Sequence, residues 1–365
     1  MNILFLWFKK KNADETDLPR ESAEKTQIKK ILLNLCFRKA NRFYLCAKKN
    51  ILMVLFSTQK PVESKNQISM KIKDYRTHFI QELSPIYDSA EAESFFYLIL
   101  EEKHQLKRID LALDPDLTFS MDEIQNWDSI VEQLKKEIPI QYLLGKTSFY
   151  GLDFEVNADV LIPRPETEEL VEWIIGDCFV PMAIGTRNDK KLKILDIGTG
   201  SGCIAIALAK NISNAQVFAI DISEKALATA QKNAEINGVN VTFIQKNILE
   251  VVSLSAVEGL NHKFDIIVSN PPYVRELEKQ EIKKNVLDNE PHLALFVEDS
   301  DALIFYRKIA QLAQKNLFQN GQLFFEINQY LGKETVDLLE KMNFKNIELR
   351  KDIYGNDRMM KAEGR

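Results

Sequence analysis

The sequence predicts an α/β protein in which a small helical domain precedes a parallel, doubly wound sheet. Two patterns indicate this fold: residues 70–145 repeat apolar side chains at helical spacing, and short apolar runs then alternate with helical stretches. Since helical stretches separate most of these runs, we expect a mainly parallel sheet that can end in a hairpin. The predicted strands are Lys193–Ile197, Val217–Ile220, Val241–Gln245, Phe264–Ser269, Gln322–Ile327, Asn346–Arg350 and Arg358–Ala362.

Start and stop residues support the predicted helices. Asp88 and Ser89 are typical cap residues ahead of an apolar block, and Ser120 with Glu123 forms an S-x-x-E capping box, in which each side chain bonds a free backbone N–H. A hairpin is expected at Ser148–Val156, where the chain alternates and then turns at a glycine. Further helices are expected at Glu166–Ile175, Cys203–Asn211, Ser223–Asn237 and Ala302–Lys315.

Charge separates an N-terminal extension from the rest of the chain. Residues 1–69 contain 14 Lys and Arg against 6 Asp and Glu, whereas the remaining residues contain 34 against 47. So acidic a body is poorly suited to a phosphate backbone and favours a protein or small-molecule substrate. We expect the extension to be poorly ordered, and the alternative is that Cys36–Phe56 form a basic amphipathic helix. The expected parts are a poorly ordered basic extension at residues 1–69, a helical domain at 70–145, a hairpin linker at 146–160 and an α/β domain at 161–365.

The composition also bears on metal binding and on location. The four cysteines are scattered and the chain has only four histidines, so we expect free thiols and no metal site. The apolar runs Ile3–Phe8 and Ile51–Phe56 are far shorter than a membrane span, and the first has its lysines after the run, unlike a secretory signal. We therefore expect a cytoplasmic protein without a membrane partner.

The clearest motif is a glycine-rich turn between the first predicted strand and the next helix. Glycine lets the backbone turn sharply and approach a ligand, and the free N–H groups of the helix favour a negatively charged ligand group. The spacing G-x-G-x-G differs from the G-x-G-x-x-G of dinucleotide-binding turns. NAD is therefore a less favoured candidate than the cofactor considered next. The candidate cofactor residues in this turn are Asp196, Gly198, Thr199, Gly200, Ser201 and Gly202.

The second predicted strand is followed by Asp221, 19 residues after Gly202. A carboxylate there can accept hydrogen bonds from both hydroxyls of a ribose, and capping of the next helix is the alternative role. Together with the glycine turn, this pattern resembles the class I S-adenosylmethionine-dependent methyltransferases. The resemblance implies a Rossmann-like, seven-stranded, mostly parallel sheet that binds S-adenosyl-L-methionine, with its methionine end on the glycine turn and its ribose on Asp221. Asn247 and Ile248 stand where that family often has Asp and a large apolar residue beside adenine, and the Asn carbonyl can accept the same hydrogen bond.

Asn270-Pro271-Pro272-Tyr273 follows the fourth predicted strand, at the sheet edge where open α/β sheets bind ligands. The Asn270 side-chain oxygen and the Pro271 carbonyl can accept both hydrogens of an amide or amino nitrogen and so aim its lone pair, while proline adds rigidity and no competing N–H. Tyr273 is expected to pack on the planar acceptor group. Catalysis then consists of positioning and electrostatics without a dedicated base. All four residues are candidate substrate-binding residues, with Asn270, Pro271 and Tyr273 as the catalytic ones and Asn270 also at the cofactor.

Segments outside these motifs resemble the protein N5-glutamine methyltransferases of the PrmC (HemK) family. The similar stretches are Pro139–Gly145, Phe149, Phe154, Leu161–Glu168, Glu290-Pro291, Ala294-Leu295, Phe325–Ile327, Asp352, Gly355 and Arg358. The resemblance runs from about Met70 to Arg358, and implies that the methyl acceptor is the glutamine of the Gly-Gly-Gln motif in class 1 peptide chain release factors. In that family the helical domain helps to dock this protein substrate. For Arg164 and Glu166 we favour a role in closing the pocket over a simple surface turn.

Two related activities remain as alternatives. One is glutamine methylation of a ribosomal protein, although those enzymes usually lack a Pro-Glu-Thr-Glu run after Pro-Arg. The other is N6-methylation of adenine in nucleic acid, because adenine also presents a planar NH2 group; the acidic body argues against it. A binding module without turnover would leave the intact motifs unexplained. The expected partners are therefore release factors, and not nucleic acid or membrane.

The charge and irregular pattern of residues 1–69 generate a first prediction. A chain that begins at Met70 should fold and transfer methyl groups at the rate of the full chain, because the patterned part of the sequence begins there. Initial rates and thermal unfolding of the two chains check this. A large loss of activity on truncation would show that the extension takes part in binding or catalysis.

Overall fold

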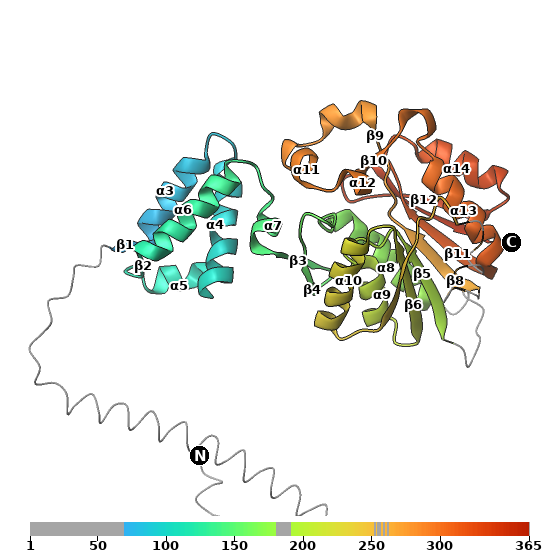
Figure 1. Ribbon diagram of the computed structural model, residues 1–365, viewed down its shortest axis with the longest axis horizontal. Coiled ribbons are helices and arrows are strands. Elements are labelled where there is room, and N and C mark those ends of the chain that lie inside the picture. Colours follow the sequence, from blue (N-terminus) through green and yellow to red (C-terminus); the bar gives the residue numbers. More distant parts are fainter. Residues whose placement is uncertain are drawn as a thin grey trace, which may run out of the picture. The chain divides into compact units, whose positions relative to one another are not determined.

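The computed structural model describes residues 69–179, 191–251, 253, 257, 260 and 263–364 (Figure 1). Apart from Ser69, the predicted basic extension lies outside the described residues, and so does the alternative helix at Cys36–Phe56. Of the cysteines in the described part, Cys178 and Cys203 are both free thiols. No helix in these residues is long and apolar enough to cross a membrane.

Residues 69–144 form helices around a common apolar core. Asp88 caps the second helix by accepting from Ala90 N and Glu91 N, and Ser120 and Glu123 form the predicted capping box. Aromatic side chains such as Trp127 fill the core, with its ring in edge contact with neighbouring rings. The elements are β1 (Ser69–Lys71), α3 (Ile72–Leu83), α4 (Ser89–His104), α5 (Arg108–Leu113), β2 (Thr118–Ser120), α6 (Met121–Leu134) and α7 (Ile140–Leu144).

A hairpin follows, as predicted. Strand β3 (Lys146–Phe149) pairs antiparallel with β4 (Leu152–Glu155). Tyr150 and Gly151 form the turn and both have positive φ, of 50° and 72°. The buried Phe149 and Phe154 side chains pack edge to face and join the core beneath the sheet of the α/β domain.

The α/β domain contains a seven-stranded sheet with strand order β12-β13-β11-β8-β5-β6-β7, which confirms the predicted architecture. The five strands from β11 to β7 are mutually parallel, and β13 pairs antiparallel with both β11 and β12. The strand order reverses between β5 and β8, which is where open α/β sheets bind ligands. The bounds are β5 (Leu192–Ile197), β6 (Ala215–Asp221), β7 (Val241–Gln245), β8 (Phe264–Ser269), β11 (Leu317–Glu326), β12 (Lys345–Lys351) and β13 (Asp357–Glu363).

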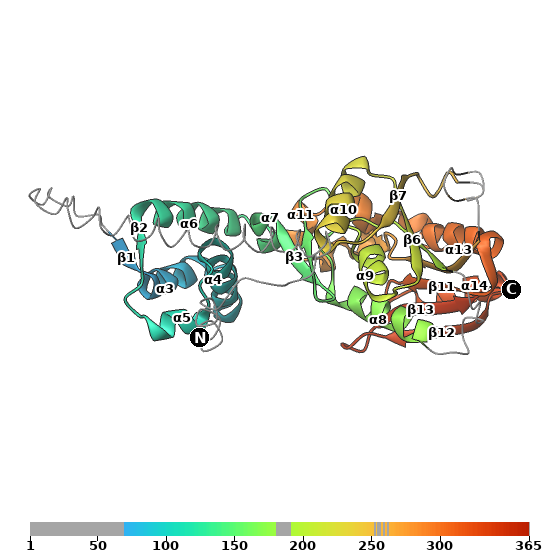
Figure 2. The same ribbon diagram turned by 90° about the horizontal axis from the view of Figure 1, so that it is seen from below.

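Helices cover both faces of the sheet (Figures 1 and 2). Successive side chains of a strand point to opposite faces, so Ile194 enters one apolar core whereas Leu195 and Ile197 enter the other. The first core is closed mainly by α8 (Pro165–Phe179) and α9 (Cys203–Asn211), with α10 (Glu224–Asn237) beside them, and the second by α13 (Ile304–Asn316) and α14 (Gly332–Lys341). Ser223 caps α10 and Gly238 ends it in the left-handed conformation, as predicted.

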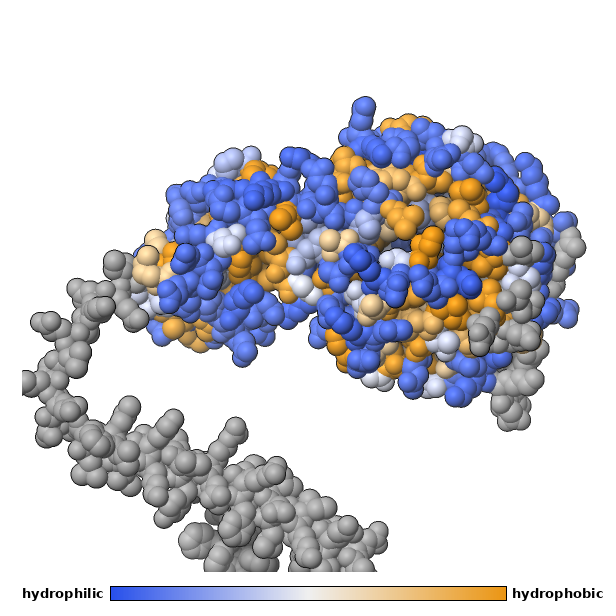
Figure 3. Space-filling model, viewed as in Figure 1, coloured by the Kyte–Doolittle hydropathy of each residue, from blue (hydrophilic) through white to orange (hydrophobic). Residues whose placement is uncertain are grey.

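The segment between β8 and α13 consists of short elements (Figure 1). These are β9 (Val274–Arg275), η2 (Glu276–Glu281), α11 (Lys284–Asn289), α12 (His292–Leu295), β10 (Phe296–Val297) and η3 (Asp299–Asp301). The sequence did not predict them, nor did it predict α14. Helix α3 lies inside the predicted helical region 70–145, although the sequence set no separate bounds for it. Large apolar side chains are exposed in this segment, such as Leu277 and Leu293. On the face shown in Figure 3, apolar residues form separate patches among hydrophilic ones.

Gly202 generates a prediction about stability. Its φ is +84°, and a Cβ there would lie 2.9 Å from Ile206 Cδ1 and 3.1 Å from Ala230 Cβ, where α9 meets α10. Gly202→Ala should therefore lower the free energy of unfolding by about 2 to 4 kcal/mol, from left-handed strain and overpacking together. Denaturant unfolding measures this.

A matched control lies in α8. Gly176 has no atom within 4 Å of a built Cβ and no positive φ, so Gly176→Ala should raise stability by up to about 1 kcal/mol through helix propensity. Equal stabilities of the two variants would contradict the packing role of Gly202.

Candidate active site

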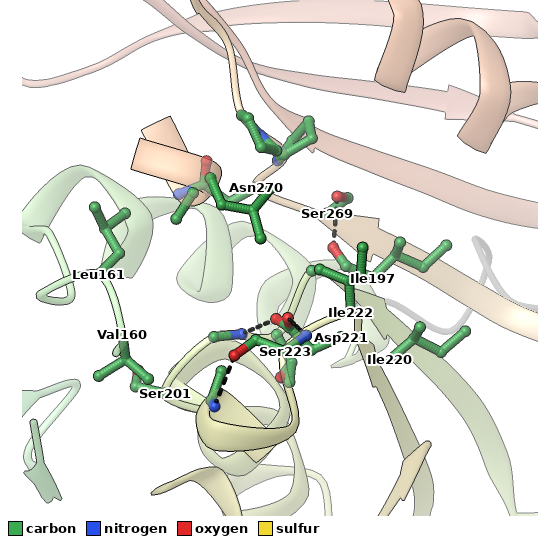
Figure 4. A pocket seen from close by; sticks show the side chains of 18 of the residues that line it. Val160, Leu161, Ile197, Ser201, Ile220, Asp221, Ile222, Ser223, Ser269 and Asn270 are labelled. Atoms are coloured by element: carbon green, nitrogen blue, oxygen red, sulfur yellow. Dashed lines mark hydrogen bonds between the residues drawn. The ribbon is translucent and has the colours of Figure 1, made fainter. Parts of the chain in front are cut away.

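A cavity of about 300 Å³ lies where the strand order reverses, at the carboxyl ends of β5, β6, β7 and β8 (Figure 4). Most of the site residues predicted from the sequence line it together, although they come from distant parts of the chain. These are Gly198, Thr199, Gly200, Ser201, Asp221, Asn247, Ile248, Asn270, Pro271 and Pro272. Three predicted residues, Asp196, Gly202 and Tyr273, are not among the residues that line the cavity.

The glycine turn leaves β5 in a tightly bonded loop. Gly198 N and Thr199 N both donate to Ile220 O, at 2.8 and 3.0 Å, so the loop is tied to the end of β6. Gly198 has a φ of +77°, and a Cβ there would lie 4.0 Å from the backbone oxygen of Asn270. The loop and the Asn-Pro-Pro-Tyr segment are therefore neighbours across the cavity.

Asp221 lines the cavity and also braces the loop around it. Its Oδ2 accepts from Gly200 N at 2.8 Å, and its Oδ1 accepts from Ser223 N at 2.9 Å (Figure 4). The sequence left two roles open for this residue, ribose binding and support of the next helix. The carboxylate faces the cavity while it bonds the turn before α10, so the two roles are compatible.

Asp196 lies behind the loop rather than in the cavity wall. Its side chain is fully buried, and its Oδ2 accepts from Thr199 Oγ1 at 2.6 Å. Burial and, to a smaller extent, the Asp221 charge raise the pKa of the Asp196 carboxyl to about 7, while hydrogen bonds from Thr199 and the Ala205 backbone oppose the shift. Asp196 thus contacts the loop in this structure and acts on the cavity through Thr199.

Asn247 and Ile248 follow β7 and reach the cavity from that side. The side-chain oxygen of Asn247 accepts from Leu249 N at 3.1 Å, and its Nδ2 donates to Glu250 Oε1 at 2.9 Å. Ile248 is buried. The Asn247 side-chain carbonyl, which the sequence suggested for adenine binding, therefore already accepts one hydrogen bond within its own turn. One lone pair of that oxygen remains for a ligand.

Asn270 follows β8 and lines the cavity together with Pro271 and Pro272. Its Nδ2 donates to Thr167 Oγ1 at 3.3 Å. The preceding Ser269 is buried and donates from Oγ to Ile197 O at 2.6 Å, which ties β8 to the end of β5 (Figure 4).

The Tyr273 side chain does not line the cavity and bonds residues behind it. Its hydroxyl donates to Glu326 Oε1 at 3.1 Å and accepts from Arg358 Nη1 at 3.4 Å. Burial is the largest cause that raises the pKa of this phenol, and the Glu326 charge adds to it. The structure thus connects Tyr273 to β11 and β13, whereas packing on a methyl acceptor stays a prediction.

Thr167, Glu326 and Arg358 belong to stretches that carried the family resemblance, but the sequence suggested no role for them. Glu326 is 1% exposed and accepts from Thr167 Oγ1 at 2.6 Å as well as from Tyr273. Burial raises the pKa of the Glu326 carboxyl, while the two hydrogen bonds and the Arg358 charge oppose the shift. Asp352, which is also buried, accepts from Arg358 Nε at 3.2 Å. The one feature of the sequence that could have indicated this site is Glu326 itself, an acid inside an otherwise apolar strand.

An ion pair joins two loops in the cavity wall. Arg164 lines the cavity, and its Nη2 lies 2.5 Å from Oε1 of Glu290, which is 3% exposed. The other oxygen of Glu290 accepts from Ile162 N at 3.2 Å. The contact fits the predicted closing role for Arg164, whereas Glu166 does not line the cavity.

Comparisons with known proteins agree with this architecture. Residues 188–352 match the model of a methyltransferase domain, and residues 74–145 match that of the PrmC N-terminal domain. A release factor glutamine methyltransferase of Flavobacterium psychrophilum is 64% identical over 296 residues, which cover 81% of this chain and all of that protein. Proteins of the same name from Bacteroides thetaiotaomicron and Streptococcus pneumoniae are 43% and 39% identical, covering 77% and 80% of this chain and 96% and 98% of their own.

The sheet order, the glycine loop and the matched domain define an S-adenosylmethionine-dependent methyltransferase. The NAD-binding alternative is thereby discarded. At 64% identity over the whole length of a relative, the chain belongs to the release factor glutamine methyltransferase family, the PrmC family that the sequence resembled.

Asp196 generates a pH-dependent prediction for the enzyme without cofactor. Its folded pKa of about 7 exceeds the ordinary 3.8, so between these values the folded state keeps a proton that the unfolded state releases. The contribution of Asp196 to stability therefore falls as the pH rises from about 4 to about 7, by up to about 4 kcal/mol.

Asn at this position has no charge and keeps an oxygen for Thr199. Asp196→Asn should therefore gain stability relative to wild type as the pH rises from about 4 to about 8. Denaturant unfolding of both proteins at the two pH values measures the difference. A difference that does not change with pH would contradict the raised pKa.

Proposed function

We propose that this enzyme transfers a methyl group from S-adenosylmethionine to the side-chain amide nitrogen of the glutamine in the Gly-Gly-Gln motif of class 1 release factors. One observation carries the proposal: Asn270, Pro271 and Pro272 line the same cavity as the glycine loop, in a chain 64% identical to a release factor glutamine methyltransferase. We also propose that the enzyme acts on protein rather than on nucleic acid, since residues 70–365 carry 47 acidic against 34 basic residues. We propose the cytoplasm as its location, because the proposed substrate takes part in translation.

The residues in the cavity fit S-adenosylmethionine. The loop Gly198–Ser201 would hold the methionine end, Asp221 the ribose, and Ile222 and Ile248 would form apolar walls for adenine. Gly198, where a side chain would narrow the gap to Asn270, keeps the space between the two segments. When bound, S-adenosylmethionine supplies an electrophilic methyl group on a positively charged sulfur.

The residues after β8 suit an amide acceptor. An amide nitrogen is a poor nucleophile, because its lone pair is delocalised into the carbonyl. The Asn270 side-chain oxygen and the Pro271 carbonyl can hold the two N–H hydrogens, which directs the nitrogen toward the cofactor. Neither Pro271 nor Pro272 has an N–H to compete for these oxygens. The chain thus contributes positioning and fixed dipoles, and the methylated nitrogen loses its proton after transfer.

Transfer of labelled methyl from S-adenosylmethionine to purified release factor tests the proposal. We expect label on the factor with Gln in the Gly-Gly-Gln motif and none on a Gln-to-Ala version. Asn270→Ala should lower kcat by about 100-fold or more, because one of two acceptors that hold the amide is lost. Cofactor binding, measured by calorimetry, should change far less than kcat, since the glycine loop and Asp221 remain.

Two further acceptors serve as controls in the same assay. A DNA duplex tests adenine methylation, and total ribosomal protein tests the related glutamine methyltransferase activity. Label on DNA alone or on a ribosomal protein alone would contradict the proposed substrate while leaving the role of the cavity intact.

A further inference from the structure

Asn270 has a side chain with two chemically different ends, and only one suits the proposed reaction. The carbonyl oxygen accepts a hydrogen bond from the acceptor amide, whereas the NH2 group would oppose that amide's own N–H hydrogens. The torsion that turns an Asn amide is broad and roughly two-fold, so the residue itself does not choose between the two directions. Something beside Asn270 must set the direction of the amide.

Thr167 lies next to Asn270 and can act toward it only as an acceptor. Thr167 is 2% exposed, and its hydroxyl has one hydrogen, which it donates to Glu326 Oε2 at 2.6 Å. Its lone pairs therefore receive Asn270 Nδ2 at 3.3 Å. With the amide reversed, two acceptor oxygens would face each other in this part-buried contact, which is costly.

Glu326 keeps the hydroxyl of Thr167 pointing away from Asn270. Its second oxygen accepts from the Tyr273 hydroxyl at 3.1 Å, and Arg358 Nη1 lies 3.4 Å from that same hydroxyl. Arg358 is held in turn by Asp352, through the 3.2 Å bond from Nε. Because Arg358 can only donate, the Tyr273 hydroxyl that accepts from it gives its own hydrogen to Glu326. The Arg358 charge favours the ionised form of Glu326, which accepts from both Tyr273 and Thr167.

We propose that Thr167 and Glu326 are positioning residues that fix the direction of the Asn270 amide, so that its oxygen faces the methyl acceptor. The inference rests on the proposed function, because it assigns Asn270 the amide-holding role. It also explains why a buried acid lies in strand β11 beneath the cavity: a carboxylate accepts two hydrogen bonds and donates none.

Thr167→Val tests the proposal, because Val has nearly the same shape but neither donates nor accepts. We expect kcat for release factor to fall by about 10- to 100-fold, while the dissociation constant of S-adenosylmethionine stays within about twofold. Thr167→Ser keeps the hydroxyl and should retain kcat within about threefold of wild type. Equal losses in the Ser and Val variants, or a Val variant with normal kcat, would overturn the proposal.

Thr335→Val is the matched control. Thr335 is also fully buried and donates from Oγ1 to Leu331 O at 2.8 Å, but it lies in α14 and does not line the cavity. It should lose stability as Thr167→Val does, with kcat unchanged. A similar fall of kcat in this variant would assign the effect of Thr167→Val to general destabilisation and overturn the proposal.

A second readout does not depend on which molecule accepts the methyl group. The side-chain amide protons of Asn270, assigned in NMR spectra by their absence from Asn270→Ala, should exchange with solvent at least about tenfold faster in Thr167→Val than in wild type. Unchanged exchange would overturn the proposal. If wild type labels no release factor, the proposed function fails, and this comparison still decides the role of Thr167.

Discussion

Three strands of the sheet end at one level, because β5 pairs in parallel with β6 on one side and with β8 on the other. Ile197 lies opposite both Ile220 and Ser269, so the glycine loop, Asp221 and Asn270 leave the sheet together. The hydrogen bond from Ser269 to Ile197 O holds this alignment at the edge. A shift of one residue in either pairing would turn the strand's side chains to the wrong face and move one of the three segments out of reach. The cavity is thus a product of strand register.

Buried acids form a second common feature of the site. Glu326, Glu290 and Asp196 are each at most 3% exposed, a position that carboxyl groups occupy rarely and at a cost in stability. Each carboxyl group is held by hydrogen bonds that neighbouring groups donate to it. Thr167 and Tyr273 donate to Glu326, an arginine and a backbone N–H donate to Glu290, and a threonine hydroxyl donates to Asp196. The acids hold the walls of the cavity in place, and the residues expected to touch ligands are mostly uncharged.

How far the sequence predicts this structure depends on how local the determining interactions are. Strands β5, β6 and β8 are largely apolar runs, and their predicted bounds differ from the observed ones by no more than two residues. Helix α14 was missed because it begins without a side-chain cap, and α11 and α12 are too short to show a period. The glycine loop and Asn270–Tyr273 were found because each is contiguous. By contrast, the bond between Thr167 and Glu326 spans 159 residues and leaves no local pattern.

The place of β13 in the sheet bears on when this enzyme becomes complete during its synthesis. β13 is made after β12 but inserts between β12 and β11, so a nascent chain that ends before it leaves the edge of β11 open. It also lacks Arg358, whose charge favours the ionised form of Glu326. The candidate cofactor residues, the last of which is Asn270, are made long before that arginine. All residues that line the cavity, the last of which is Ile309, therefore precede β13 in the chain, and the hydrogen bonds behind Asn270 are completed only when β13 has closed the sheet.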